Sequence, residues 1–212
     1  MIGENNYFPK NFDDVLATIV YERLDIISKK YFNNFRFYNF SYFTIDNFYY
    51  IDDGSYYSRD GKISFIVSSV DEEFIRFFIS RLIVEGLIYE DNYLKVVDVS
   101  LIDIPDFTKE TVFHTISPIQ VNLFKCKSDL MDYLKQMLLD NYCEYYSLIY
   151  PEESLKMYAG DFVEKHNSLD EEYDNYYNMQ IILEGEIELI RFAWDIGLGE
   201  SNFKGFGMLG LS

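Results

Sequence analysis

The sequence is short of long apolar runs, of cysteine and of basic residues, and each shortage excludes a class of protein. No run of about 18 apolar residues occurs, so the sequence predicts no transmembrane helix. No basic stretch followed by an apolar one opens the chain, so we expect no signal peptide and an intracellular, cytoplasmic protein. The two cysteines, Cys126 and Cys143, form no CxxC pair, which predicts reduced thiols and no zinc site.

Basic residues are outnumbered two to one, since 18 Lys and Arg face 36 Asp and Glu for a net charge of −18. Nucleic-acid binders usually carry a basic surface, because neutralising phosphates supplies much of their affinity. The balance argues against broad binding to DNA or RNA, and we expect no DNA partner. It is compatible with a basic protein partner or with solubility alone.

Hydrophobic residues make up 49% of the 212 residues, which is enough to build one large core or two small ones. In the first half, amphipathic periods and alternation predict helices and strands in the order helix, strand, strand, helix, strand. The expected elements are a helix over 13–28, a strand-rich segment over 35–51, a strand over 62–68, a helix opened by a capping box at 69–72 and a strand over 93–104.

The second half begins after a natural break at Pro105 and has a similar order of elements. The expected elements are a strand over 111–124 interrupted at Ser117 and Pro118, a helix over 128–146, strands over 179–183 and 205–211, and a helix over 186–196. The acidic segment 151–175 receives no assignment. The similar order predicts an α+β protein with an N-terminal domain over 1–105 and a C-terminal domain over 106–212.

Residues 197–207, called here the glycine loop, contain four glycines in the spacing GxGxxxxxGxG. Glycine permits positive φ and close backbone approach, and a row of exposed amides can hold a phosphate. The loop joins a helix to a strand and lacks GK[ST], so it is neither a P-loop nor a dinucleotide fingerprint. A tight helix-to-strand connection with Gly197 as the helix C-cap is the alternative reading.

The stretch MQIILEGEIELIRFAWDIGLGESNFKGFGML resembles the C-terminus of the CRISPR-associated endoribonucleases that cut precursor CRISPR RNA, the sixth Cas family of the RAMP superfamily. Two further segments resemble the family in order and distance: FIVSSVDEEFIRFFISRL is similar to its strand-then-helix segment, and FHTISPIQV is similar to its SPI strand. The resemblance covers roughly residues 12–211 and implies two tandem ferredoxin-like, RRM-like domains. The first lacks its usual first strand, because the chain starts almost at the first helix.

The resemblance implies binding of one CRISPR repeat RNA and metal-independent cleavage, without a cofactor, that leaves a 2′,3′-cyclic phosphate. Such chemistry needs a base near the ribose 2′-hydroxyl, an acid at the leaving oxygen and a cation on the phosphate. Many family members place a histidine just after the first helix, where this chain has Lys29, Lys30 and Tyr31. These three are the candidate catalytic residues, or else a solvated helix end. Of the two histidines, His114 lies in the SPI strand and is expected to be structural, and His166 lies in the acidic segment.

Candidate RNA-binding residues lie in and before the C-terminal motifs, although isolated surface lysines are an equally open reading for the basic ones. They are Lys125, Lys127, Gly199, Ser201, Lys204 and Gly205. The missing histidine, the missing strand and the acidic charge also support a second hypothesis. In that hypothesis the chain is a non-catalytic mimic, perhaps phage-encoded, that binds CRISPR effector proteins and inhibits CRISPR immunity.

Overall fold

The structure is a computed structural model that describes residues 6–10, 12–41, 43–89, 92–122, 129–148, 154–167 and 174–212. The chain divides into two compact units. The first comprises Met1–Arg36, Tyr42–Val67 and Asp71–Asp103, and the second comprises Phe37–Ser41, Ser68–Val70 and Ile104–Ser212. Both units combine helices with antiparallel strands, so the predicted α+β class is confirmed. Within the described residues, no helix is both long and apolar enough to span a bilayer.

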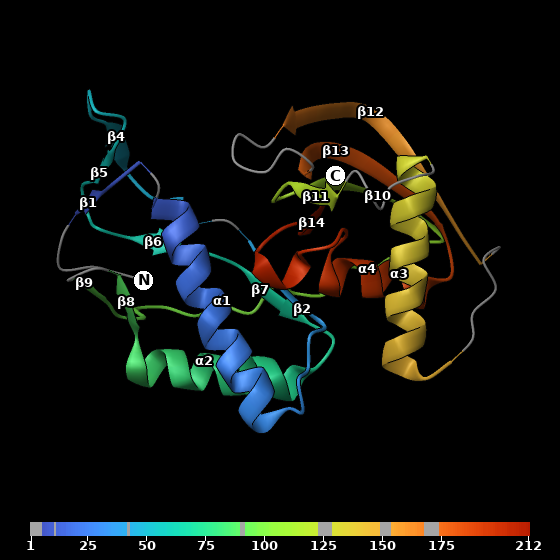
Figure 1. Ribbon diagram of the computed structural model, residues 1–212, viewed down its shortest axis with the longest axis horizontal. Coiled ribbons are helices and arrows are strands. Elements are labelled where there is room, and N and C mark those ends of the chain that lie inside the picture. The colour runs from blue at the N-terminus through green and yellow to red at the C-terminus, as the bar shows by residue number, and fades with distance from the viewer. Residues whose placement is uncertain are drawn as a thin grey trace. The chain divides into compact units, whose positions relative to one another are not determined.

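Two helices build the core of the first unit, α1 (Phe12–Tyr31) and α2 (Glu72–Glu85) (Figure 1). Each buries one apolar stripe at helical spacing, which is how an amphipathic helix stabilises a small core. The buried side chains are Phe12, Leu16, Val20, Leu24 and Ile27 of α1 and Phe74, Phe78 and Leu82 of α2. Ile83, near the last turn of α2, lies outside this stripe and is 54% exposed.

The strands of the first unit are two or three residues long and form three small antiparallel sheets. They are β1 (Tyr7–Phe8), β3 (Thr44–Ile45), β4 (Phe48–Tyr50), β5 (Tyr56–Ser58), β6 (Ile63–Ser64), β8 (Leu87–Tyr89) and β9 (Asn92–Leu94). The sheet orders are β1-β5-β4, β3-β6 and β8-β9. A strand therefore precedes α1, but it has only two residues and pairs with a strand of the β4–β5 hairpin.

The strand predicted over 93–104 is largely wrong. Strand β9 ends at Leu94, and residues 96–107 have no regular secondary structure. Their aliphatic side chains face solvent, with Leu101 86% exposed. Alternation of apolar and polar residues cannot by itself make a strand, because the backbone also needs a neighbouring strand to receive its hydrogen bonds.

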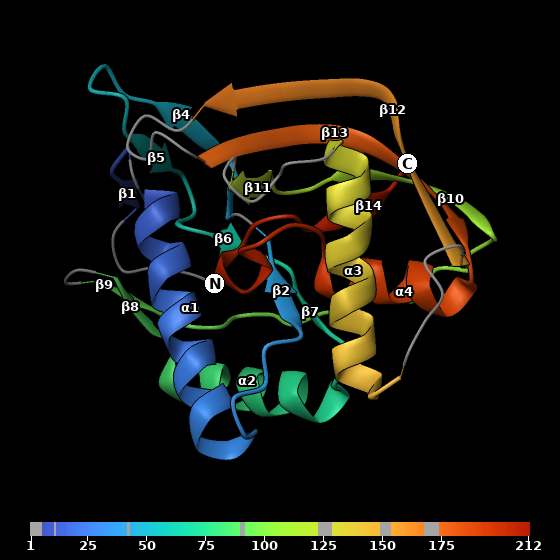
Figure 2. The same ribbon diagram turned by 45° about the vertical axis from the view of Figure 1, so that its right-hand side comes forward.

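The second unit has the order β-α-β-β-α-β of a ferredoxin-like fold around one sheet. Its elements are β10 (Glu110–Thr115), β11 (Ile119–Asn122), α3 (Leu130–Tyr146), β12 (Leu155–Asn167), β13 (Asp174–Gly185), α4 (Ile187–Ile196), the short 3₁₀ helix η2 (Asn202–Lys204) and β14 (Leu209–Leu211). The strand order is β11-β13-β10-β14, and β12 pairs along the other side of β13 (Figure 2). The predicted interruption at Ser117 and Pro118 is confirmed by the gap between β10 and β11.

Helices α3 and α4 supply apolar side chains to the core of the second unit, and the sheet supplies the rest. Fully buried examples are Leu134, Leu138, Ile181, Leu183, Leu189, Ile190 and Phe192. Strand β2 (Tyr38–Phe40) and residues 68–69 of β7 (Val67–Ser69) also belong to this unit, although they come from the first half of the sequence. The final strand is shorter than the predicted 205–211, because residues 205–207 form the end of the glycine loop and β14 begins only at Leu209.

Candidate functional site

The glycine loop begins where α4 ends, in the second unit. Gly197 has a φ of 74°, and its amide donates to the Ala193 carbonyl at 2.8 Å, which confirms the predicted helix C-cap. The Leu198 amide then donates to the Gly207 carbonyl at 2.9 Å and closes the loop at its base. The loop is therefore a closed structure whose two ends are held together by the backbone.

The SPI tripeptide (residues 117–119) fixes the second half of the glycine loop. The Gly207 amide donates to the Pro118 carbonyl at 2.8 Å, and the Met208 amide donates to Ser117 Oγ at 3.0 Å. In return the Ile116 amide donates to the Met208 carbonyl at 2.7 Å. Ser117 is fully buried. The two motifs that are far apart in the sequence are therefore one hydrogen-bonded structure.

Three glycines of the loop lie where a side chain has no room. A Cβ on Gly207 would lie 1.7 Å from the Leu198 carbonyl oxygen, and one on Gly205 would lie 2.7 Å from the Phe40 ring. A Cβ on Gly199 would lie 2.8 Å from the Gln120 carbonyl oxygen. All three also have φ between 72° and 102°. Their first role is close packing of the loop against β2 and β11.

Asn39 of β2 holds the loop from a third side, and the sequence interpretation missed it. Its Nδ2 donates to the Phe206 carbonyl at 3.1 Å, and its Oδ1 accepts from the Phe40 amide at 2.7 Å. The residue is fully buried. An asparagine between aromatic residues gives no local signal of this role, because its partner is 167 positions away in the sequence.

Glu200 joins the loop to both β11 and α3. Its Oε1 accepts from the Tyr133 hydroxyl at 2.6 Å and from the Asn122 amide at 3.2 Å, while its own amide donates to the Gln120 carbonyl. A carboxylate with two donors forms strong hydrogen bonds, so this contact resists displacement. Glu200, the only acidic residue of the loop, therefore has a structural role.

The predicted RNA-binding residues differ in how far their side chains and amides are accessible to a phosphate. Lys204 is exposed and Ser201 is half-buried, whereas Gly199 and Gly205 are buried. The Gly205 amide donates to the Asn202 carbonyl at 3.0 Å, so it is not available to a phosphate. Lys125 and Lys127 lie outside the described residues. An RNA contact by any of these residues stays a prediction.

The second candidate group lies at the C-terminal end of α1, in the first unit. Aromatic contacts hold this end on α2: the Tyr31 ring is 4.7 Å from the Phe77 ring, and the Phe32 ring is 5.2 Å from the Phe74 ring. Ser28 adds a hydrogen bond to the Phe35 carbonyl that closes the turn after the helix. The backbone is therefore fixed, while the side chains at the end of α1 face solvent.

Lys29, Lys30 and Tyr31 form a small cationic and phenolic group. Lys29 Nζ lies 2.7 Å from Asp25 Oδ2, and this hydrogen bond raises the pKa of the lysine. Lys30 Nζ lies 5.0 Å from the centre of the Tyr31 ring. A hydrogen bond with the Lys30 ammonium lowers the pKa of the Tyr31 phenol, and the charge of Arg81 acts in the same direction. This group can place positive charge on a phosphate and exchange a phenolic proton.

The two histidines lie within the sheet of the second unit. His114 pairs with Gly210 across β10 and β14, and a Cβ on Gly210 would lie 2.8 Å from the His114 ring. His114 is exposed, so its expected structural role stays a prediction. His166 lies in β12 opposite Tyr176 of β13.

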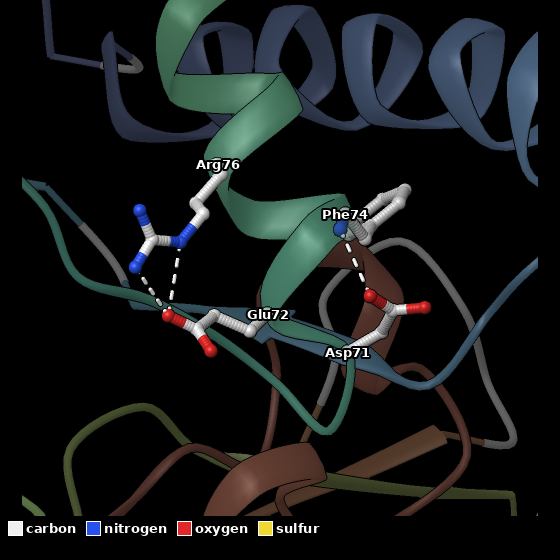
Figure 3. Close-up of polar contacts among 4 residues, drawn as sticks. All are labelled: Asp71, Glu72, Phe74 and Arg76. Atoms are coloured by element: carbon white, nitrogen blue, oxygen red, sulfur yellow. Dashed lines mark hydrogen bonds and ion pairs between the residues drawn. The ribbon is translucent and has the colours of Figure 1, made fainter.

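The segment similar to the family's strand-then-helix motif caps α2 (Figure 3). Asp71, rather than the predicted Ser69, is the cap, since its carboxylate accepts from the Phe74 amide at 3.0 Å. Glu72 accepts from Arg76 one turn later at 2.6 Å. Ser69 donates instead to the Phe37 carbonyl. This motif therefore places the helix and contributes no free cation.

The ferredoxin-like second unit and its glycine loop held by the SPI tripeptide define a RAMP-type protein. The family described as "CRISPR associated protein Cas6, C-terminal" matches residues 102–211, just over half of the chain. The chain belongs to the Cas6 family.

The similarity to known Cas6 proteins extends over almost the whole chain. The CRISPR-associated endoribonuclease Cas6 1 of Methanocaldococcus jannaschii is 26% identical over 95% of this chain and 86% of the relative. A solved structure described as "CRISPR associated protein Cas6" superimposes with a TM-score of 0.79 at 23% identity, covering 99% of this chain and 96% of the other. One from Pyrococcus furiosus, described as the product of a Cas6-related gene, has a TM-score of 0.76 at 19% identity, covering 99% and 94%. At this identity the structural likeness shows the fold.

Proposed function

We propose that the chain binds CRISPR repeat RNA and cleaves precursor CRISPR transcripts within the repeat. The observation that carries this proposal is the family match over residues 102–211, which includes the glycine loop and the SPI tripeptide. The relative of M. jannaschii is named an endoribonuclease. One solved structure with a TM-score of 0.76 is described as a RAMP protein that binds different RNA substrates. An RNA transcript as substrate places the activity in the cytoplasm.

The chemistry proposed is attack of a ribose 2′-hydroxyl on the adjacent phosphate, without a metal, to leave a 2′,3′-cyclic phosphate. Tyr31 is the candidate group for proton transfer, because its lowered pKa brings the phenolate within easier reach at neutral pH. Lys30 is the candidate cation for the phosphate oxygens. Lys29, already paired with Asp25, is the candidate for holding the RNA backbone near this group.

RNA contacts of the second unit are proposed for the exposed part of the glycine loop. Lys204 carries the charge that a phosphate needs, and Ser201 adds a hydroxyl donor. The alternative function, a non-catalytic mimic that inhibits CRISPR immunity, draws no support from the relatives that the chain matches. Binding to effector proteins is therefore not part of the proposal.

A cleavage assay tests this function. The CRISPR repeat RNA of the encoding genome, end-labelled and incubated with the protein in EDTA, is expected to give one cut and a cyclic-phosphate end. Tyr31→Phe and Lys30→Ala are each expected to slow the single-turnover cleavage rate by about 10² or more. Tyr93→Phe and Lys95→Ala remove the same groups from exposed positions of the same unit and should leave the rate unchanged.

Three results would contradict parts of the proposal. Failure to bind the repeat at low salt would sink RNA processing altogether. Binding without cleavage would leave a repeat-binding protein that is not an enzyme. Full activity of Tyr31→Phe and Lys30→Ala would move the active site away from the end of α1.

A further inference from the structure

The sheet of β1, β5 and β4 lies at the start of α1 and has two different faces (Figure 1). One face packs on the helix: the Phe12 ring is 5.5 Å from the Phe8 ring and 5.3 Å from the Tyr56 ring. Phe8 and Phe12 are fully buried. Since side chains alternate along a strand, the neighbours of Phe8 and Tyr56 must point to the opposite face.

That opposite face carries three tyrosines side by side, called here the tyrosine row. Tyr7 of β1 pairs with Tyr57 of β5, and Tyr57 pairs with Tyr49 of β4. The rings of Tyr49 and Tyr57 are 5.3 Å apart. Their residues are 39%, 36% and 51% exposed in the order Tyr7, Tyr57, Tyr49. The row is thus a set of neighbouring aromatic side chains that the described part of the unit leaves partly open to solvent.

Arg59 extends this face with a positive charge. It lies two positions after Tyr57 and one residue beyond the end of β5, and its amide donates to the Asn47 carbonyl at 3.0 Å. Arg59 is exposed and has no ion pair with any residue in the described ranges. At the β1 edge of the row the Tyr7 hydroxyl donates to Asp53 at 3.4 Å.

We propose that the tyrosine row and Arg59 bind a single-stranded segment of RNA by base stacking. The inference rests on the proposed function and adds a binding surface to it. Every base has a π face, so exposed tyrosines on a sheet bind single strands with little sequence preference, and a guanidinium holds the neighbouring phosphate. Tyrosine and arginine are also enriched at protein interfaces, so a protein contact is the competing outcome that the experiment must separate from RNA binding.

Strand β4 also contains the matched control for this proposal. Tyr50 is next to Tyr49 and 67% exposed, but its ring contacts Tyr56 on the opposite face of the sheet. Tyr49→Leu and Tyr50→Leu therefore make the same chemical change one residue apart, on opposite faces. Leucine keeps an apolar side chain in the strand and removes the ring that a base would stack on.

The experiment measures binding of a short oligouridylate and of the repeat RNA to the full chain at low salt. Tyr49→Leu is expected to weaken oligouridylate binding by roughly tenfold, and Tyr50→Leu should stay within about twofold of the unsubstituted chain. Arg59→Gln is expected to reduce the salt dependence of binding by about one phosphate contact. The single-turnover cleavage rate with saturating repeat RNA should be unchanged in Tyr50→Leu, and thermal melting verifies that all three variants fold.

Different results separate this inference from the function that it builds on. A chain that binds and cleaves the repeat, but whose Tyr49→Leu and Tyr50→Leu variants bind oligouridylate alike, overturns the tyrosine row alone. So does a change in oligomeric mass on Tyr49→Leu without a change in RNA affinity, because it assigns the row to a protein contact. A chain that binds neither RNA overturns both proposals.

Discussion

The glycine loop of the second unit and the end of α1 in the first unit are fixed by opposite means. The loop is held by its backbone: Ser117, Pro118, Asn39 and Gln120 receive or supply hydrogen bonds to its amides and carbonyls. The end of α1 is held by its side chains, through ring contacts with Phe74 and Phe77 that leave the ammonium groups in solvent.

This difference separates the pattern that marks the family from the residues that are proposed to perform its chemistry. The glycine pattern is dictated by contacts below 3 Å that no side chain could occupy, so it follows from the fold whether or not RNA is bound. At the end of α1 only the ring of Tyr31 takes part in the packing, through Phe77, and the packing does not dictate the identity of Lys29 and Lys30. A clear family pattern in the loop is therefore compatible with an unusual set of catalytic candidates at positions 29–31.

The largest effect on stability is expected from a methyl group on the most crowded glycine of the loop. Gly207→Ala would place Cβ 1.7 Å from the Leu198 carbonyl oxygen at a φ of 72°, so the two ends of the glycine loop must separate. We expect a loss of roughly 4 kcal/mol or more in the free energy of unfolding, measured by urea denaturation, and poor recovery of folded protein.

Gly54→Ala is the matched control for that prediction. Its φ is 83°, similar to that of Gly207, but its Cβ would meet only the flexible Lys10 side chain at 3.4 Å. We expect a cost of about 1 kcal/mol from the backbone conformation alone. Equal losses in the two variants would show that crowding does not fix the loop.

Asp195 of α4 is a largely buried acid near the glycine loop, in contrast to the exposed charged residues at the end of α1. Burial raises the pKa of Asp195 in α4 to about 6, although Arg191 acts in the opposite direction. The folded chain therefore holds this proton more tightly than the unfolded chain, where the pKa is 3.8. The stability from this group is complete below the unfolded pKa and is lost as pH rises through about 6.

Asp195→Asn should remove this dependence. The variant is expected to be more stable than the unsubstituted chain at pH 8, by up to about 3 kcal/mol, and equally stable near pH 4. The readout is the difference in unfolding free energy between the two chains at each pH, which cancels the titration of all other carboxyls. Glu188→Gln, exposed on the same helix, should give a difference near zero at both pH values. A constant difference for Asp195→Asn would place the carboxylate in water.

The sequence predicted those features that a local pattern determines. Helical spacing located α1, α3 and α4 within three residues at each end, and the capping signal located the start of α2. Gly197 and the break at Ser117 and Pro118 are predictable because glycine and proline act on their own backbone. The two motifs were joined only through the family resemblance. Their hydrogen bonds, from Gly207 to Pro118 and from Met208 to Ser117, are a property of the fold that no spacing rule contains.

The missed features depend on distant partners. Asn39 is a polar residue in an aromatic strand, and its role depends on the distant Phe206 carbonyl, to which it donates a hydrogen bond. Residues 96–104 alternate like a strand, but none of the described strands pairs with them. Asp71 replaced Ser69 as the cap of α2 because Ser69 donates to Phe37 instead. In each case the choice between two local possibilities was made by a neighbour that the sequence does not reveal.

The smallest expected effect tests the side-chain contact that supplements the backbone of the loop. Tyr133→Phe removes the 2.6 Å hydrogen bond to Glu200 and leaves the carboxylate its bond from the Asn122 amide. We expect a loss of about 1.5–3 kcal/mol in the free energy of unfolding, typical of one hydrogen bond to a charged group. Tyr146→Phe, on the same helix and 47% exposed, should cost less than about 0.5 kcal/mol.

Because the backbone contacts remain, the Tyr133→Phe variant should retain its affinity for repeat RNA. A large loss of affinity without a loss of stability would mean that Glu200 and Tyr133 orient the residues of the loop that contact RNA. The backbone hydrogen bonds would then not be sufficient to fix the loop.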